Sequence, residues 1–181
     1  MKKYFVGVAI LIIGLSYIVR PYFFQKKAAL VQQSMKLTSP AFESYQKIPA
    51  VYTCDGRKVH PAFAVSGVPQ GTRSLVFIID DPDAPGSTFT HWVIWNIDPL
   101  IKEIPEGSIP EKSQEGTNSA GSIGYTPPCP PPSGGQHRYF FTLYALDAKV
   151  GLDGKATKTD IENAMRGHVM VQSLLVGVYG R

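Results

Sequence analysis

Two segments of the sequence concentrate side chains that can hold or move protons. Residues 80–85 place three carboxylates within four positions, and His91 follows shortly afterwards. Carboxylates packed that closely repel one another, so at least one needs a cationic or hydrogen-bonding partner or a raised pKa. The strand that begins at His91 could supply such a partner. The second segment, residues 124–139, is rich in proline, which fixes the backbone φ angle and lacks an N–H donor, so it should form a stiff pocket wall.

These segments need regular elements to position them. Compact apolar runs rich in β-branched and aromatic residues predict strands at 74–80, 91–98, 138–146 and 169–179. One helix is predicted, beginning at Thr159 with Glu162 in a capping box and ending near Gly167. The pattern favours an antiparallel β-sandwich with one or two peripheral helices.

The charge distribution argues against a nucleic-acid partner. The chain has 181 residues, 44% of them hydrophobic, and a formal charge of +4. Residues 1–33 contain five of the 18 Lys and Arg residues and none of the 14 Asp and Glu residues. The remainder of the chain is therefore close to neutral and presents no basic surplus to a nucleic acid.

The N-terminal segment predicts a membrane anchor. Residues 4–19 carry no charge, and the aromatic residues 22–24 follow Arg20. A helix over this stretch is long enough to cross a bilayer if Arg20 reaches the interface. We expect a single transmembrane helix over residues 1–24, a linker over 25–35 and a domain over 36–181 on the exported side. A cleaved signal peptide, which would leave the domain secreted, is the alternative.

A series of short motifs resembles a known family. They are, in order, Tyr52-Thr53-Cys54-Asp55-Gly56, Gly67-Val68-Pro69, Asp81-Pro82-Asp83-Ala84-Pro85, His91-Trp92, Gly116-x-Asn118-Ser119, Gly124-Tyr125, Pro127-Pro128-Cys129-Pro130-Pro131 and His137-Arg138-Tyr139. Over about residues 36–181 the series is similar to the phosphatidylethanolamine-binding proteins, and more narrowly to their prokaryotic Raf kinase inhibitor-like branch. The resemblance implies a mainly β fold, a Greek-key type sandwich of two antiparallel sheets with a small anion pocket at one end.

The resemblance also implies which residues form the pocket. Asp81, His91, His137 and Tyr139 match the family's pocket residues, and Tyr125 lies on the loop that lines it. Two histidines can give charge-assisted hydrogen bonds to a phosphate or carboxylate oxygen, and the tyrosine adds a neutral donor. The aspartate can orient one imidazole and accept a proton from a monoanionic phosphate or an ammonium group. The combination suits a zwitterionic or singly charged phosphate.

Other residues near these motifs are predicted to be structural. Arg138 alternates with His137 and Tyr139 along a strand, so it should face the other way and pair with Asp83. Cys54 and Cys129 could form a disulfide in an exported domain, or remain reduced thiols.

The sequence also departs from the branch at three positions. His60-Pro61 stands where a serine-proline pair is usual, Val65 replaces a tryptophan, and Thr126 stands where glycine is common. His60 is therefore a further histidine whose distance from the pocket is open. We expect the ligand preference of relatives not to transfer with the fold.

Three classes of function remain open. The leading hypothesis is a membrane-tethered binding protein that captures a small anionic or phosphate-bearing ligand, such as a phospholipid head group, without a cofactor or metal. The second is a regulator of a kinase or protease through protein contacts, with no partner named by the sequence. The third is a small hydrolase or isomerase that uses Asp81, His91 and His137 for acid–base chemistry. A zinc or iron site from those residues lacks tight ligand spacing, and a Cys129 nucleophile would have few N–H groups nearby for an oxyanion.

Overall fold

The structure is a computed structural model and describes residues 34–181. Its larger sheet has six strands in the order β2 (Gln46–Lys47), β9 (Val169–Gly180), β8 (Gln136–Leu146), β4 (Ser74–Asp81), β5 (Phe89–Ile97) and β7 (Gln114–Glu115). The smaller sheet has three, in the order β1 (Lys36–Thr38), β3 (Phe63–Ser66) and β6 (Glu103–Ile104). A 3-10 turn, η1 (Ala50–Tyr52), and one helix, α1 (Lys158–Met165), complete the described elements.

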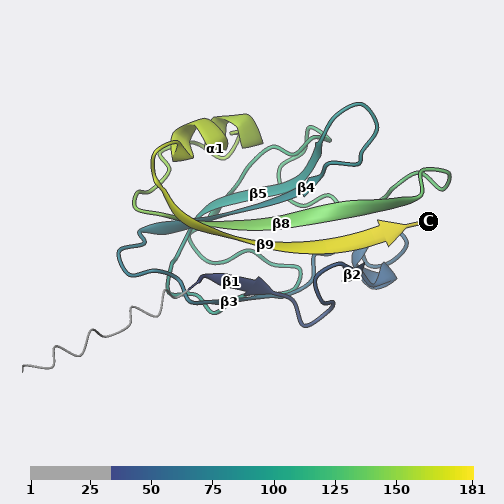
Figure 1. The fold of residues 1–181 in the computed structure, drawn as a ribbon. Helices are drawn as coiled ribbons and strands as arrows, with labels where there is room; N and C mark the ends of the chain where they lie inside the picture. The colour runs from purple at the N-terminus through teal and green to yellow at the C-terminus, as the bar shows by residue number, and fades with distance from the viewer. Residues whose placement is uncertain (1–33) are drawn as a thin grey trace, which may run out of the picture. The chain divides into compact units, whose positions relative to one another are not determined.

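The six-stranded sheet is covered on both faces, which explains the continuous apolar runs in its central strands. Along β4, Leu75, Phe77 and Ile79 belong to the core shared with the small sheet. The alternate residues Val76 and Ile78 belong to a second core that is closed by α1. Figure 1 shows α1 on one side of the sheet and β1 and β3 on the other. A strand whose two faces are both buried needs apolar residues at every position.

The predicted sandwich is largely antiparallel, with one exception. The pairs β4–β5, β4–β8 and β8–β9 are antiparallel over long registers. The short strand β2 instead pairs in parallel with β9, with Gln46 opposite Gly177. Gly177 permits this close approach, because a Cβ there would lie 2.6 Å from the Ile48 side chain. The larger sheet is therefore mixed.

The helix begins two residues earlier than the sequence predicted. Thr157, not Thr159, is the N-cap, and its backbone N–H donates to the Asp160 carboxylate at 2.9 Å. This start turns Ile161 and Met165 toward the sheet, where both are buried. Burial of these two side chains selects between two overlapping Thr-x-x-acid sequences that have similar capping potential. The predicted end is close, because Gly167 follows with a φ of 82°.

The predicted fold is corrected in its membrane-spanning part. Within residues 34–181 the structure contains no helix long and apolar enough to cross a membrane. The only α-helix described there is α1, with eight residues. The anchor and most of the linker predicted at residues 1–24 and 25–35 lie outside the described residues.

Candidate functional site

A small pocket lies at one end of the large sheet, where β4 ends and β5 and β8 begin. Its cavity has a volume of about 240 Å³. The lining residues come from the two segments that the sequence singled out: Asp81, Ala84, Pro85, Phe89, His91, Thr126, Pro127, Cys129, Pro130, Pro131 and His137. The sheet brings these segments together because β4 pairs with both β5 and β8. We refer to this cavity as the His–Asp pocket.

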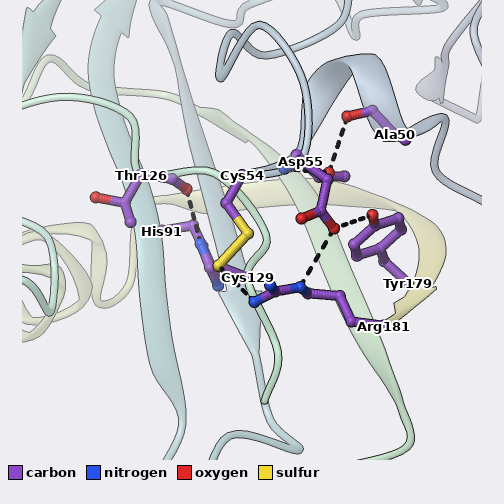
Figure 2. The surroundings of a disulfide bond; sticks show 9 residues. Ala50, Cys54, Asp55, His91, Thr126, Cys129, Tyr179 and Arg181 are labelled. Atoms are coloured by element: carbon purple, nitrogen blue, oxygen red, sulfur yellow. Dashed lines mark hydrogen bonds and ion pairs between the residues drawn. A yellow bond between two sulfur atoms is a disulfide. The ribbon is translucent and has the colours of Figure 1, made fainter. Parts of the chain in front are cut away.

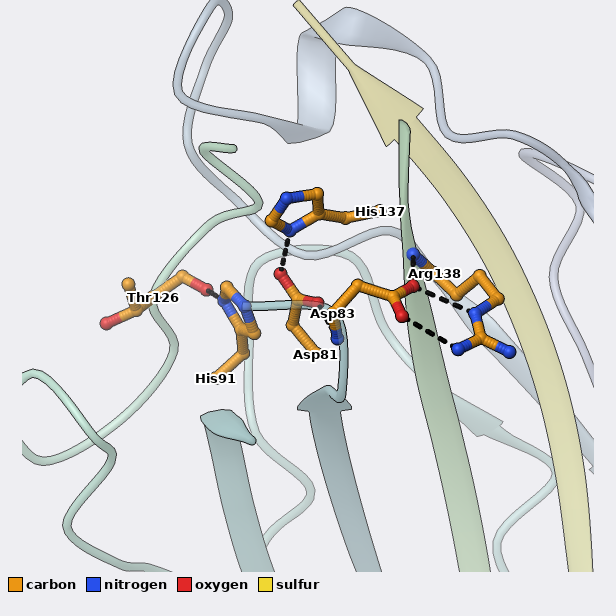
Figure 3. Close-up of polar contacts among 6 residues, drawn as sticks. All are labelled: Asp81, Asp83, His91, Thr126, His137 and Arg138. Carbon is orange, nitrogen blue, oxygen red and sulfur yellow. Dashed lines mark hydrogen bonds and ion pairs between the residues drawn. The ribbon is translucent and has the colours of Figure 1, made fainter. Parts of the chain in front are cut away.

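His137 and Asp81 form a buried pair in this pocket. The Nδ1 atom of His137 lies 2.7 Å from Asp81 Oδ2, and both side chains are 5% exposed. Asp81 Oδ1 also accepts the backbone N–H of Asp83 at 2.9 Å, which holds the carboxylate in place. Because Nδ1 faces a carboxylate it carries the proton, so His137 Nε2 is left for another partner. Figure 3 shows the imidazole directed at Asp81.

His91 presents its second ring nitrogen in the same way. Its Nδ1 donates to the Thr126 carbonyl oxygen at 2.7 Å, while Nε2 is buried and has no hydrogen-bond partner in the described part of the chain. Burial lowers the pKa of His91 below its ordinary value, with the Thr126 carbonyl and Asp81 acting in the opposite direction. The His91 ring is therefore mainly neutral at pH 7, and its Nε2 atom is then a hydrogen-bond acceptor. A buried polar atom without a partner needs an explanation, and a molecule bound in the adjacent cavity would supply one.

Two tyrosines lie elsewhere than the sequence placed them. Tyr139 is fully buried in the core and does not line the His–Asp pocket, although its ring packs against His91 with centroids 5.3 Å apart. Burial and the Asp81 charge raise its pKa above the ordinary value, and its hydroxyl has no partner among residues 34–181. Tyr125 points away from this pocket into a neighbouring one, where its hydroxyl donates to the Tyr52 carbonyl at 3.2 Å.

Asp83 and Arg138 hold the rim of the pocket from outside. The guanidinium makes two bonds to the carboxylate, Nε to Oδ2 at 2.8 Å and Nη2 to Oδ1 at 2.7 Å. The backbone N–H of Arg138 adds a third at 2.9 Å. Hydrogen bonds from Arg138 lower the pKa of Asp83 to about 2. This pair fastens the loop after β4 to the start of β8, and Figure 3 shows it beside the His137–Asp81 pair.

A disulfide between Cys54 and Cys129 closes the opposite wall. Cys129 lines the pocket, and the bond ties it to a segment 75 residues earlier. The backbone N–H of Cys54 also donates to the Pro128 carbonyl at 3.0 Å. Next to the bond, Asp55 accepts the Tyr179 hydroxyl at 2.6 Å and pairs with Arg181 at 3.3 Å (Figure 2). The proline-rich loop is thus crosslinked to the rest of the domain.

The sequence analysis missed Asn118 as a positioning residue. Its Nδ2 donates to the Gly124 carbonyl at 2.8 Å and to Thr126 Oγ1 at 2.9 Å, and its Oδ1 accepts from the Ala120 N–H at 2.9 Å. Asn118 is buried and shapes the loop whose Thr126 carbonyl orients His91. A Gly-x-Asn-Ser motif is visible in the sequence, but its role depends on contacts made after folding.

Comparison with known proteins places the chain in a family. Residues 38–180 match the sequence model described as phosphatidylethanolamine-binding protein. The chain belongs to the phosphatidylethanolamine-binding protein family. A UPF0098 protein of Methanothermobacter thermautotrophicus is 46% identical over 152 residues, which cover 81% of this chain and 99% of that protein. The resemblance seen in the motifs is therefore confirmed.

Solved structures of this family agree with the fold. A phosphatidylethanolamine-binding protein homolog from Chlamydia trachomatis, CT736, is 38% identical with a TM-score of 0.78, over 82% of this chain and 99% of that one. YbcL of E. coli, described as a member of the mammalian family, is 25% identical with a TM-score of 0.77 and the same coverage. The β-sandwich is thus a family feature.

Proposed function

We propose that this protein captures a small anionic, phosphate-bearing group in the His–Asp pocket. The observation that carries the proposal is the buried, unpartnered Nε2 atom of His91 beside the His137–Asp81 pair. Both imidazoles have their Nδ1 proton committed, to the Thr126 carbonyl and to Asp81, so both keep Nε2 for the ligand. Both histidines line one cavity, and two such nitrogens match the several oxygens of a phosphate group.

The proposed capture is coupled to protons. A neutral Nε2 atom accepts a hydrogen bond, so it binds a phosphate that carries its own proton, and a protonated Nε2 donates to a phosphate oxygen. In both cases the complex holds more protons than the free dianionic ligand and the free protein with neutral imidazoles hold together. Anion affinity should therefore rise as the pH falls from about 7.5 to 6.

Binding is favoured over turnover by the state of the nucleophiles around the cavity. Cys129 is held in the disulfide and therefore offers no free thiolate. We infer that the pocket holds its ligand without forming a covalent intermediate. The crosslinked proline-rich wall supports this reading, because a preformed site loses little conformational entropy on binding.

The disulfide also supports a location for the domain. Bonds of this kind persist in oxidising compartments and are rare where thiols are kept reduced. We infer that residues 34–181 work on the exported side of the membrane. A thiol titration of the protein taken from its native compartment under alkylation would show two free thiols if this inference is wrong.

The decisive experiment follows the imidazole signals of the full-length protein by NMR during titration with phosphoethanolamine at pH 6. Saturable shifts of His91 and His137 are expected, with His60 and His168 unmoved. His137→Gln should weaken binding at least about tenfold. The matched control is His168→Gln, because His168 also contacts an aspartate, Asp147 at 2.8 Å, but on the surface.

Absence of saturable shifts at millimolar phosphoethanolamine, and equally with inorganic phosphate, would overturn the proposal. A regulatory role through protein contacts would then come first. Product formation during the titration would instead point to the acid–base enzyme.

A further inference from the structure

A second and larger cavity lies on the other side of the loop that walls the His–Asp pocket. Its volume is about 600 Å³. Lys58, Val59, His60, Trp92, Gly107, Ser108, Ile109, Glu115, Ile123, Gly124 and Tyr125 line it. None of these residues lines the His–Asp pocket. The loop divides the two cavities, with Tyr125 facing one and Thr126 the other, and we call the second cavity the aromatic pocket.

Three aromatic rings make up its floor. The His60 ring stacks on Trp92 with centroids 4.4 Å apart and an interplanar angle of 25°. The Tyr125 ring meets both edge-on, with centroids 5.6 Å from His60 and 6.0 Å from Trp92. Burial lowers the pKa of His60 below its ordinary value, so its ring is neutral at pH 7 and does not repel a cation.

A carboxylate without a cationic partner stands beside these rings. Glu115 is half-buried, and its Oε1 accepts the Trp92 indole N–H at 2.7 Å. Within residues 34–181 no Lys, Arg or His nitrogen lies within 4.0 Å of it. Lys58 also lines the pocket but is exposed and makes no ion pair with Glu115. The indole neutralises none of the carboxylate charge, so Glu115 keeps its negative charge without a direct ion pair.

Two exposed apolar side chains also line the aromatic pocket. Ile109 and Ile123 line it, and they are 43% and 57% exposed, which is unusual for isoleucine. An apolar rim over an aromatic floor would cover the hydrocarbon part of a ligand. The carboxylate would meet its charged end.

We propose that the aromatic pocket binds a small organic cation, a primary or methylated ammonium group carried on an apolar or aromatic body. The half-buried Glu115 carboxylate supplies the charge contact for the ammonium group, and the half-buried Tyr125 ring supplies aromatic surface beside it. The site is separate from the His–Asp pocket and does not depend on the function proposed for it.

Benzylammonium chloride is the probe, and benzyl alcohol is its neutral counterpart of similar size. The readout is the pair of indole N–H signals in ¹H–¹⁵N spectra of the full-length protein. The Trp92 N–H is bonded to Glu115, whereas the Trp95 N–H is buried with no partner and does not line the pocket. Benzylammonium should shift the Trp92 signal saturably and leave the Trp95 signal in place, and benzyl alcohol should bind at least about tenfold more weakly.

Glu115→Gln is the variant that isolates the charge, because the amide oxygen can still accept the Trp92 N–H. It should weaken benzylammonium binding about tenfold and leave benzyl alcohol unchanged. Glu103→Gln is the matched control, since this exposed glutamate lies on β6 outside the pocket. Lys58→Gln should tighten benzylammonium binding about twofold by removing a like charge.

The outcomes separate the possibilities. The proposal would be overturned if the Trp92 signal showed no saturable shift up to about 10 mM benzylammonium, because any remaining affinity would then be very weak. Equal binding of both probes would show an apolar site with no preference for cations and would overturn it as well. If Glu115→Gln fails to fold, the two probes on the unmodified protein still decide. Asp81→Asn should abolish phosphoethanolamine binding and leave benzylammonium binding intact.

Discussion

Two histidine–aspartate pairs lie at opposite ends of β8 and differ mainly in burial. At one end, His137 Nδ1 lies 2.7 Å from Asp81, and both side chains are 5% exposed. Just beyond the other end, His168 Nδ1 lies 2.8 Å from Asp147, with exposures of 49% and 55%. An exposed pair contributes little to stability, whereas a buried one holds its members in one geometry. The same type of contact is therefore an exposed surface pair for His168 and Asp147, and the centre of a candidate site for His137 and Asp81.

The surroundings of the two pairs explain this difference. Asp81 is held by the turn after β4 and is enclosed by the proline-rich loop, which the disulfide anchors. Asp147 and His168 lie where β8 passes into the segment before β9, and no loop covers them. The proline-rich loop, anchored by the disulfide, thus encloses the His137–Asp81 pair and holds it in one geometry.

The largest expected effect comes from removing that anchor. The Cys54→Ser/Cys129→Ser double variant should lose about 4 kcal/mol of unfolding free energy, because the bond closes a long loop. Denaturation in urea measures the loss. Phosphoethanolamine binding should weaken as well, while the His168 signals stay in place. A double variant with unchanged stability and affinity would show that the proline-rich pocket wall keeps its structure without the disulfide.

Breaking the pairs themselves tests the comparison directly. Asp81→Ala should cost about 3 kcal/mol, because it leaves a buried imidazole and the Asp83 N–H without their partner. Asp147→Ala should cost less than about 1 kcal/mol. Both values come from the same urea titrations. Similar costs would refute the claim that burial separates the two pairs.

The low pKa of His91 makes stability depend on pH in a defined direction. In the unfolded chain the imidazole has its ordinary pKa of about 6.5, and burial lowers the pKa in the folded state. The neutral ring's contribution is therefore complete above pH 6.5 and is lost as the pH falls through the lower folded value. His91→Asn keeps a donor for the Thr126 carbonyl. The stability advantage of the unmodified protein over this variant should shrink between about pH 7 and 5, and a constant difference would contradict the shift.

The smallest effect concerns the space around His137. A Cβ added at Gly134 would lie 3.3 Å from His137 Nε2 and 3.2 Å from the Pro131 carbonyl. Gly134→Ala should therefore displace the ring slightly and weaken phosphoethanolamine binding about threefold. Gly151→Ala is the control, because a Cβ there meets nothing within 4 Å. Calorimetric titration of both variants with phosphoethanolamine tests whether the loss of affinity comes from the displaced His137 ring, because only Gly134→Ala should then bind more weakly.

Much of the fold was predictable because it depends on local pattern. The four long strands follow from apolar runs such as residues 74–81, which are buried on both faces. Contacts between distant residues were less accessible. The helix start at Thr157 depended on which residues meet the sheet, and Asn118 acts through a loop that exists only after folding. The membrane-spanning helix was predicted at residues 1–24, which lie outside the described residues, and residues 34–181 contain no helix long and apolar enough to cross a membrane.

The sequence by itself determined the four long strands, the loops that carry chemistry and the family, because residue type and spacing along the chain record these directly. Only the tertiary structure decided which side of a loop each residue faces. Tyr125 and Thr126 are neighbours in sequence, yet they line different cavities. Tyr139 lies within the core, while His137, two residues away, lines the pocket. Burial and direction arise from packing between sheets and loops, which sequence spacing does not specify.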